Sequence, residues 1–574
     1  MKITGEIFDF IVVGIKHLSG QIVALVLATR LANADLKPSV LLIEAGGPQP
    51  SNESLSLANR WDSDTSHADI NWNYVSLPEP ELNDRPIDVS RGKALGGTSN
   101  INYLCWTPPT PEYIAEWQAR VGGDSFFNWN DTQRLLDGLV NYNIHTLTGN
   151  SEYPLHAMTD VPLKDFVTDI PRDANGPFNL TYSTYLKQGD LKLLQGAEEA
   201  GFLQNKHIVA GSSLGYGIMA SMSTANGYLR STPSEAFLTD KPDNLVIKTG
   251  LEATRILFEG KTAEGVEQNG GEQCFTARLE VILSAGSINT PKLLILSGVG
   301  PKVHIKELGI PLIADLPGVG QHLQDHYAIP FQWETNESFA DTSVPAVFEP
   351  IANQDLFNAV VIFDRDKAMV DHACFSELPL ATQRWLGRKN APHLELLAVN
   401  NWKPGPSPPG KPNIFLVAVG LAPQSEGSII LPSADWHDAP NIQLNLLSDK
   451  HGLDFTSAIS YTRKALEVIE HTDSVSPHIA SPRIRPNSDS EADIAAFLRE
   501  HVMTLWHPTQ TTRMGPRDDE GDSVVDPSFR VRGLNKLRIA DLGVVPVMPN
   551  SHPASVALLV GAWVAERIIS EYSQ

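Results

Sequence analysis

The chain has 574 residues, which is long enough for a large buried core and exceeds one ordinary domain. Hydrophobic residues make up 42% of it and charged residues 19%, a composition typical of a folded protein. The formal net charge of −23 argues against nucleic acid or an anionic membrane surface as a partner. We therefore expect a protein that acts on small molecules.

The three cysteines, Cys105, Cys274 and Cys374, are too few and too widely spaced for a disulfide framework or a CxxC metal site. This spacing predicts no bound metal and a reducing, cytoplasmic environment. Residues 1–6 lack the basic start and apolar stretch of a signal peptide. No apolar run approaches the length of a membrane span, so we expect no membrane partner.

The first 45 residues have the pattern of a dinucleotide-binding unit. An apolar run at 8–13 predicts a buried parallel strand, 22–34 a helix, and 39–45 a second strand. The acidic residue that closes the second strand, Glu44, is placed to bind the hydroxyls of an adenosine ribose. The alternative is an ordinary parallel unit that ends in a solvated glutamate.

Further elements follow in chain order. Residues 153–233 are polar and rich in Gly, Pro and Asn, and residues 330–500 are less regular, which indicates a separate substrate-side layer. The end of the chain returns to clear signals, with Pro553 in the first turn of a helix. The pattern predicts strands at 244–249, 253–258, 279–286 and 536–541, and a helix at 553–570. This layout indicates a nucleotide domain assembled from both ends of the chain, with a cap between them.

Two glycine-rich stretches carry chemical information. The first, residues 91–102, contains Gly96 and Gly97 followed by small hydroxyl residues, so its backbone can approach a planar or charged ligand closely. Taken alone, it could equally be a loop with a tight turn. The second, residues 286–300, describes a turn, a helix with proline in its first turn, and a glycine-rich exit.

Together these stretches resemble the two sequence signatures of the glucose–methanol–choline (GMC) oxidoreductases. The similarity continues through most of the chain, at 316–326, 505–515, 525–533, 537–541 and 549–553. The resemblance implies an α/β fold with a Rossmann-like FAD-binding domain built from discontinuous segments and an α+β substrate-binding cap with an antiparallel sheet. It assigns 8–318 to the N-terminal FAD-binding region, 425–566 to the C-terminal catalytic region and 319–424 to the cap.

The resemblance also gives roles to two histidines. The family's base beside the reactive flavin edge matches His507, and the second member of its pair matches His552. Alcohol oxidation requires removal of the hydroxyl proton as hydride leaves the carbon for flavin N5, and an imidazole is suited to accept that proton. A second imidazole can position the hydroxyl and stabilise alkoxide character. Without the resemblance, either histidine is better interpreted as a structural residue.

The cofactor implied by the resemblance is FAD, with the helix after Pro553 aimed at the flavin pyrimidine. Some relatives attach FAD through a histidine in the first signature; Ile101 stands there, so we expect non-covalent FAD. Tyr103 matches a substrate-stacking tyrosine of aryl-alcohol-oxidising relatives, although a packing role is as reasonable. The implied FAD contacts are Gly14, Glu44, Ala45, Trp72, Gly97, Asn102, Tyr103, Leu104, Cys105, Ala253, Trp506, Asp541 and Pro553.

The sequence departs from the family at its glycine fingerprint. Gly14 and Gly20 are present, but Lys16 replaces the second glycine, whose role is to let backbone touch the pyrophosphate. The segment 15–24 is also about five residues longer than usual. Three explanations compete. In the first, the fingerprint is disrupted and the protein binds little flavin; in the second, the loop reaches the phosphates another way. In the third, the segment is a translation error at an exon boundary. The abrupt return of similarity on both sides favours the third explanation.

The predicted function is FAD-dependent oxidation of an alcohol group of a small organic molecule, of the specialised-metabolite kind, to an aldehyde or ketone. Reoxidation by oxygen or by a quinone-type acceptor is left open. Two rival hypotheses remain: a non-redox cyclase or lyase on the same scaffold, and a flavin-poor, inactive relative prompted by Lys16.

Overall fold

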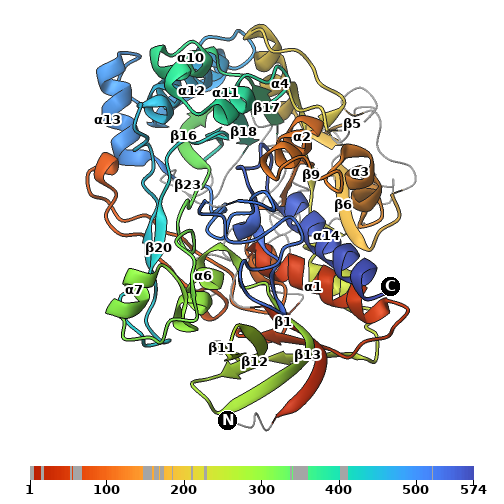
Figure 1. Cartoon of the computed structure of the whole chain (residues 1–574). Helices are drawn as coiled ribbons and strands as arrows, with labels where there is room; N and C mark the ends of the chain where they lie inside the picture. The colour runs from red at the N-terminus through yellow and green to blue at the C-terminus, as the bar shows by residue number, and fades with distance from the viewer. Residues whose placement is uncertain are drawn as a thin grey trace.

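The computed structural model (Figure 1) describes most of the chain. The described residues are 5–14, 18–51, 55, 68–145, 158–160, 167, 174–183, 185–208, 211–224, 229–336, 339, 360–400, 411–519 and 521–573. Lys16, on which the interpretation of the fingerprint depends, lies outside them. Within the described part of the chain, no helix is both long enough and apolar enough to cross a bilayer.

A seven-stranded sheet contains the predicted nucleotide unit. Its parallel part has the order β10-β2-β1-β13, with β24 beside the C-terminal half of β13. These strands are β1 (Glu6–Gly14), β2 (Val40–Glu44), β10 (Leu245–Thr249), β13 (Gln273–Leu283) and β24 (Leu537–Ile539). The antiparallel strands β11 (Ala253–Glu259) and β12 (Thr262–Gln268) extend the sheet from β13. The predicted strands are confirmed, and both ends of the chain contribute to one sheet.

Three helices cover this sheet. Helix α1 (Leu18–Asn33) packs against the C-terminal helix α14 (Ala554–Tyr572), and the two run side by side near β1 in Figure 1. Helix α6 (Gly286–Leu296) follows β13 directly and is buried along its whole length. The predicted helix at 553–570 is confirmed, with Pro553 at its N-cap. All-round hydrophobicity in α14 agrees with its burial.

The second large sheet is antiparallel, with the order β22-β16-β19-β18-β17-β8 and with β23 beside β16. Its strands are β8 (Gly215–Ile218), β16 (Tyr327–Thr335), β17 (Val360–Asp364), β18 (Leu394–Asn400), β19 (Asn413–Gly420), β22 (Ile479–Ile484) and β23 (Met503–Thr504). Much of the 330–500 region, which we expected to be less regular, therefore forms strands of the predicted antiparallel cap sheet. Its central strands are buried on both faces, so they show no alternating pattern.

Pro330 lies within β16 and made this strand hard to predict, because proline has no backbone N–H to donate to a neighbouring strand. On the edge shared by β22 and β23, pairing covers Gln332–Thr335 and Tyr327–Ala328. Position 330 falls in the gap between those two pairings. The missing N–H therefore costs the sheet no ladder hydrogen bond there.

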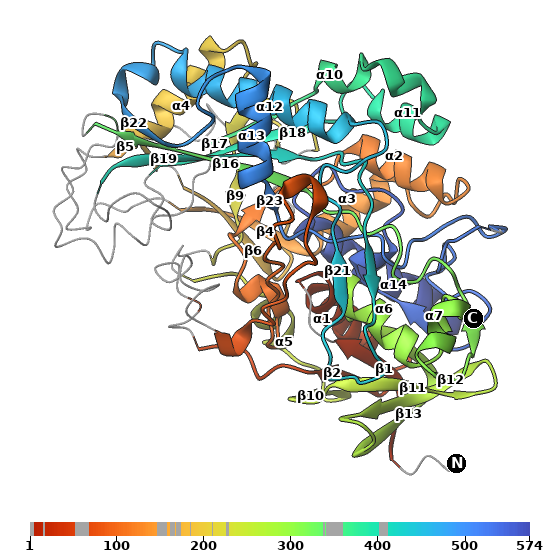
Figure 2. The ribbon, with the colours of Figure 1, turned by 90° about the vertical axis from the view of Figure 1, so that its left-hand side faces the viewer.

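Helices cover the outer face of the antiparallel sheet, above it in Figure 2. They are α4 (Gln188–Glu199), α10 (Lys367–Val370), α11 (Leu380–Leu386), α12 (Leu453–Glu470) and α13 (Glu491–His501). The opposite face carries a separate buried apolar group, which we call the inner cluster: Cys105, Ile208, Met219, Val361, Phe363, Leu397, Val399, Val419 and Leu421. Alternate residues of a strand point to opposite faces, so Glu395 shares the inner face of β18 with Leu397 and Val399.

Smaller elements complete the described fold. They are β3 (Cys105–Trp106), β4 (Val140–His145), β5 (Met158–Asp160), β6 (Phe178–Ser183), β7 (Tyr185–Lys187), β9 (Ala220–Ser221), β14 (Val299–Gly300), β15 (Ala314–Asp315), β20 (Ser428–Ile430), β21 (Asn441–Gln443), α2 (Pro111–Arg120), α3 (Trp129–Asp137), α5 (Pro233–Leu238) and α7 (Lys302–Glu307). The predicted α/β class, with a Rossmann-like domain and an antiparallel cap sheet, is confirmed.

Candidate active site

The two predicted catalytic histidines meet between the antiparallel sheet and the start of α14. The ring centroids of His507 and His552 lie 5.3 Å apart, with an interplanar angle of 84°. His507 is 9% exposed and His552 is 6% exposed. Segments separated by more than forty residues therefore place two imidazoles edge to face in one buried site.

The backbone at His507 is held by charged groups. Asp325 accepts a 2.7 Å hydrogen bond from the His507 backbone N–H and a 2.5 Å bond from the Thr504 hydroxyl. Arg91 donates a 2.7 Å bond to the carbonyl of Trp506, whose φ of 58° is unfavourable for a side chain of that size. Burial raises the pKa of Asp325 to about 6, opposed by the positive charge of Arg91.

A third histidine, His326, contacts His507. The two Nδ1 atoms are 2.9 Å apart, and Nε2 of His326 lies 2.8 Å from the carbonyl oxygen of Pro549. Burial lowers the pKa of His326 to about 3 and holds the pKa of His507 well below its usual value. Both rings are therefore neutral near pH 7. The sequence placed His326 in a family-like stretch but gave no reason to assign it a role.

His552 has its own partner. Its Nε2 lies 3.0 Å from Oε1 of Glu395, and its backbone N–H donates a 2.8 Å bond to the Thr107 hydroxyl. Glu395 is fully buried on the inner face of β18, among the inner cluster. Its other oxygen has no hydrogen-bond partner among the described residues. No sequence signal marked this glutamate, because a single acidic residue in an apolar strand resembles an exposed position.

The predicted flavin contacts of the first signature lie close to this pair. The rings of Tyr103 and Trp506 are 5.9 Å apart, and Tyr103 also packs against the inner cluster. Asn102 accepts a 3.0 Å bond from Arg230 at Oδ1, and the Leu104 carbonyl accepts one of 2.9 Å from Met222. Cys105 belongs to the inner cluster. The structure thus brings Asn102 to Cys105 together with Trp506, His507 and His552.

Gly97 begins a short 3-10 helix, Gly97–Asn100, that packs against α1. A Cβ atom on Gly92 would lie 2.4 Å from the carbonyl carbon of Gly97, so the two backbones need the absence of a side chain. Gly96 and Gly97 have φ of 100° and 60°. The glycine pair of the first signature therefore forms a tight turn against the nucleotide domain.

Gly14, Glu44 and Ala45 lie at the C-terminal edge of the parallel strands, away from the histidine pair along the chain's nucleotide sheet. Gly14 and Glu44 are register partners at the ends of β1 and β2. The backbone N–H of Leu251 donates a 3.0 Å bond to the Glu44 carbonyl, which brings the start of β11 to this edge. The arrangement is the one expected for an adenosine-binding end.

The Glu44 carboxylate is already engaged within the protein. It accepts a hydrogen bond from the Gln21 side-chain amide and one of 2.6 Å from the backbone N–H of Gly46. A Cβ atom on Gly14 would meet the same Gln21 amide nitrogen at 2.3 Å. Gln21 is fully buried, so its side chain occupies the space between Gly14 and Glu44.

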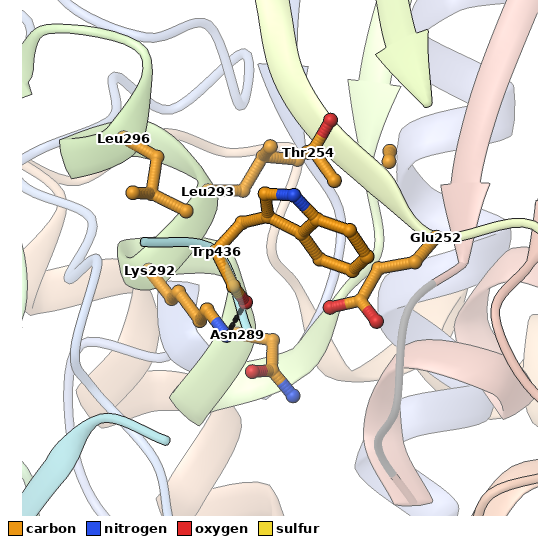
Figure 3. Close-up of a pocket in the computed structure, with 8 residues that line it drawn as sticks. Glu252, Thr254, Asn289, Lys292, Leu293, Leu296 and Trp436 are labelled. Carbon is orange, nitrogen blue, oxygen red and sulfur yellow. Dashed lines mark hydrogen bonds between the residues drawn. The ribbon is translucent and has the colours of Figure 1, made fainter. Parts of the chain in front are cut away.

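Ala253 lines a small pocket between β11 and α6 (Figure 3), whose labelled residues include Glu252, Asn289 and Trp436. Lys292 closes one side by donating a 2.6 Å bond to the Trp436 carbonyl, drawn as a dashed line in Figure 3. This pocket lies on the nucleotide domain rather than beside the histidine pair.

Trp72, another predicted contact, stacks on Tyr74 at 6.3 Å, with the Lys93 ammonium 4.2 Å from its ring. Its backbone N–H donates a 2.8 Å bond to the carbonyl of Arg91, so it lies beside the first signature.

Asp541 and Pro553 flank the last loop before α14. Asp541 accepts bonds from the backbone N–H groups of Gly286 and Gly543, both of 2.8 Å, and from the Thr290 hydroxyl at 2.6 Å. Burial raises its pKa to about 6. Its side chain therefore ties β24 to α6. Pro553 caps α14 and accepts a bond from the Ala557 backbone N–H at 2.8 Å.

The parallel nucleotide sheet, the glycine turn and the buried imidazole pair together define a nucleotide-dependent oxidoreductase. Two family models described as GMC oxidoreductase match the chain, one over residues 24–328 and the other over residues 423–561. The chain belongs to the GMC oxidoreductase family, and its cofactor is FAD.

Individual relatives agree with this assignment. A dehydrogenase of Emericella nidulans is 28% identical over 98% of this chain and 93% of its own length. An oxygen-dependent choline dehydrogenase of Chromohalobacter salexigens is 30% identical over 98% of this chain and 94% of its own length. The structure of an Aspergillus oryzae formate oxidase variant superposes with a TM-score of 0.83 at 25% identity, covering 99% of both chains.

The residues present fit FAD at its flavin end. The glycine turn has no side chains at Gly96 and Gly97 that would keep a planar ligand from its backbone, and the buried Arg91 has Nε and Nη2 without hydrogen-bond partners in the described ranges. Ile101, at the position of a covalent attachment in some relatives, has no nucleophilic atom. At the adenosine end the fit requires the Gln21 side chain to leave Glu44, which a flexible side chain can do.

Replacing Gln21 with alanine is expected to tighten FAD binding about tenfold. The change removes the Gln21 amide from the Glu44 carboxylate and makes room for the ribose there, and a hydrogen bond to a charged group contributes about 1.5–3 kcal/mol. A fluorescence titration of cofactor-free protein with FAD measures the dissociation constant. Gln118→Ala on α2 serves as the control, because that side chain binds the Asp124 carbonyl instead. An unchanged or weaker affinity in Gln21→Ala would show that Gln21 does not compete with the cofactor.

Proposed function

We propose that the protein oxidises an alcohol group of a small organic molecule to an aldehyde or ketone. The observation that carries the proposal is the buried pair His507 and His552, with ring centroids 5.3 Å apart and with His507 held neutral by burial. A neutral imidazole can accept a proton, and a second imidazole beside it can hold the oxygen that loses it. The choline dehydrogenase relative supports a CH–OH donor.

The reaction removes a proton from the hydroxyl oxygen and a hydride from the carbon that bears this hydroxyl group. His507 accepts the proton, and His552 hydrogen-bonds the hydroxyl oxygen and stabilises its developing negative charge. FAD, when bound, supplies the acceptor for the hydride and its two electrons. Glu395 lies 3.0 Å from Nε2 of His552 and fixes the orientation of that ring. The electron acceptor that completes the cycle would be dioxygen or a quinone-type compound.

The surroundings of the pair favour an alcohol with an apolar skeleton. Tyr103 and Leu505 pack against the inner cluster, and both lie next to residues of the site. These apolar neighbours favour the apolar part of a substrate, since burying charge against them would cost desolvation free energy. The family resemblance implies a specialised metabolite, and we propose this as the substrate class.

Anaerobic mixing of the FAD-loaded protein with benzyl alcohol, hexan-1-ol and choline tests the proposal. We expect at least one alcohol to bleach the oxidised flavin absorbance at a rate that saturates with concentration, with the apolar alcohols faster than choline. Product formed without bleaching would favour the cyclase or lyase. A purified protein that retains no FAD even when the cofactor is added would favour the inactive relative.

A further inference from the structure

His326 joins three segments that the sequence presented separately. It ends the stretch 316–326, contacts His507 of the stretch 505–515, and contacts the carbonyl of Pro549 at the start of the last loop. The ring is fully buried, and the planes of His326 and His507 cross at 78°. Nδ1 of His326 therefore meets Nδ1 of His507, and Nε2 of His326 meets the carbonyl oxygen of Pro549.

The chemistry of these partners determines where the protons are. A carbonyl oxygen can only accept, so Nε2 of His326 carries a hydrogen and donates it to Pro549. A neutral imidazole has one N–H, so Nδ1 of His326 carries a lone pair. The 2.9 Å contact then requires a hydrogen on Nδ1 of His507. A neutral His507 with a hydrogen on Nδ1 has its lone pair on Nε2.

The surroundings keep His326 in this neutral form. Burial, together with a smaller contribution from the nearby His552, lowers its pKa to about 3. Arg91 and Asp325 lie near His507, and the Asp325 carboxylate is engaged by the Thr504 hydroxyl and the His507 backbone, while Glu395 contacts His552. Neither Arg91 nor Asp325 acts as a hydrogen-bond acceptor for the His326 ring. The Nδ1 atom of His507 therefore meets a neutral acceptor rather than a carboxylate.

We propose that His326 is a positioning residue that fixes the hydrogen of His507 on Nδ1 and leaves Nε2 as the atom that accepts the substrate's hydroxyl proton. The inference rests on the proposed function. When His507 takes that proton it becomes an imidazolium, and its Nδ1–H bond to His326 becomes charge-assisted and stronger. His326 thus stabilises the protonated base without touching the substrate.

Two near-isosteric variants separate the two bonds of His326. In His326→Asn, the amide oxygen takes the place of Nδ1 and can still accept from His507. In His326→Gln, the amide nitrogen takes the place of Nε2 and can still donate to Pro549. We expect the anaerobic flavin-reduction rate, with the alcohol that reduces the parent protein fastest, to stay within about tenfold in His326→Asn. In His326→Gln we expect it to fall by about 100-fold or more, as loss of the correct tautomer does elsewhere.

The apparent dissociation constant of the alcohol should stay unchanged in both variants, because His326 does not contact substrate. A purely structural role predicts the opposite order, with His326→Gln active and His326→Asn impaired. That order, or equal rates in both variants and the parent, overturns the proposal. FAD content and the melting temperature of each variant identify any that fail to fold.

A second measurement needs no turnover. Two-bond nitrogen–proton correlation spectra of the FAD-loaded protein, labelled with 15N-histidine, report the tautomer of each ring, and His507→Gln identifies the signals of His507. In the parent protein we expect the hydrogen of the neutral His507 ring on Nδ1. In His326→Gln we expect that hydrogen to be no longer confined to Nδ1. A parent ring with its hydrogen on Nε2 refutes the proposal. Failure of every alcohol to reduce the flavin would refute the proposed function alone.

Discussion

Replacing His507 with alanine is expected to lower the rate of flavin reduction by an alcohol by about 10²–10⁴-fold, the usual contribution of a general base. The substitution removes the imidazole that contacts His326. It leaves the hydrogen bond from the backbone N–H of residue 507 to Asp325 in place. Stopped-flow absorbance under anaerobic conditions measures the rate. The acid limb of its pH profile in the parent protein should lie below the ordinary histidine pKa of about 6.5, since burial lowers the pKa of His507.

The matched control is His437→Ala. That ring is 67% exposed, pairs with Asp435 and stacks on Trp436, and contacts neither histidine of the pair in the described residues, so its loss should leave the reduction rate unchanged. Equal rates for His507→Ala and the parent protein would remove His507 from the chemistry. Loss of bound FAD in His507→Ala would instead indicate a structural defect, and the cofactor absorbance of each preparation distinguishes the two results.

Replacing Arg538 with alanine is expected to destabilise the protein by about 3–5 kcal/mol, the cost of leaving one member of a buried ion pair without its partner. Arg538 is fully buried on β24 and contacts Glu280 of β13 through Nε at 2.6 Å and Nη2 at 2.9 Å. It also donates a 2.7 Å bond to the Ser528 carbonyl. The midpoint of urea unfolding, followed by intrinsic fluorescence, measures the loss.

Arg530→Ala is the control for this substitution, because Arg530 pairs with Glu571, which Arg538 also contacts. Its side chain is 49% exposed, so the pair should contribute less than about 1 kcal/mol. A shift in the Arg538→Ala midpoint no larger than that of Arg530→Ala would mean that the Glu280 carboxylate finds water or another partner when Arg538 is removed.

The nucleotide half of the fold was predictable because its signals are local. The strand at 8–13 is a continuous apolar run, and the helix at 553–570 begins at a proline that suits its first turn. The strands of the antiparallel sheet carry no such local signal, and only the family resemblance implied that sheet. Strands such as β16 are covered on both faces, and Pro330 interrupts the pattern at a point where the neighbouring strands leave a gap.

The site shows the same division. His507 and His552 could be selected because each stands in a family-like stretch, and the structure brings their rings together. The partners of these rings could not be selected. Glu395 reaches His552 from a strand of another sheet, and the contact between His326 and His507 spans 181 positions. Such contacts depend on the packing of distant segments, which no local pattern encodes.

The position of Gln21 bears on how the chain acquires its cofactor. With the Gln21 amide on the Glu44 carboxylate, this buried charge has a hydrogen-bond donor from within the protein before FAD binds. Binding is then an exchange of one hydrogen-bond donor for another, and the free energy released is the difference between the two bonds. FAD binding therefore raises the thermal stability of this protein less than it would in a protein whose carboxylate had no hydrogen-bond donor before binding.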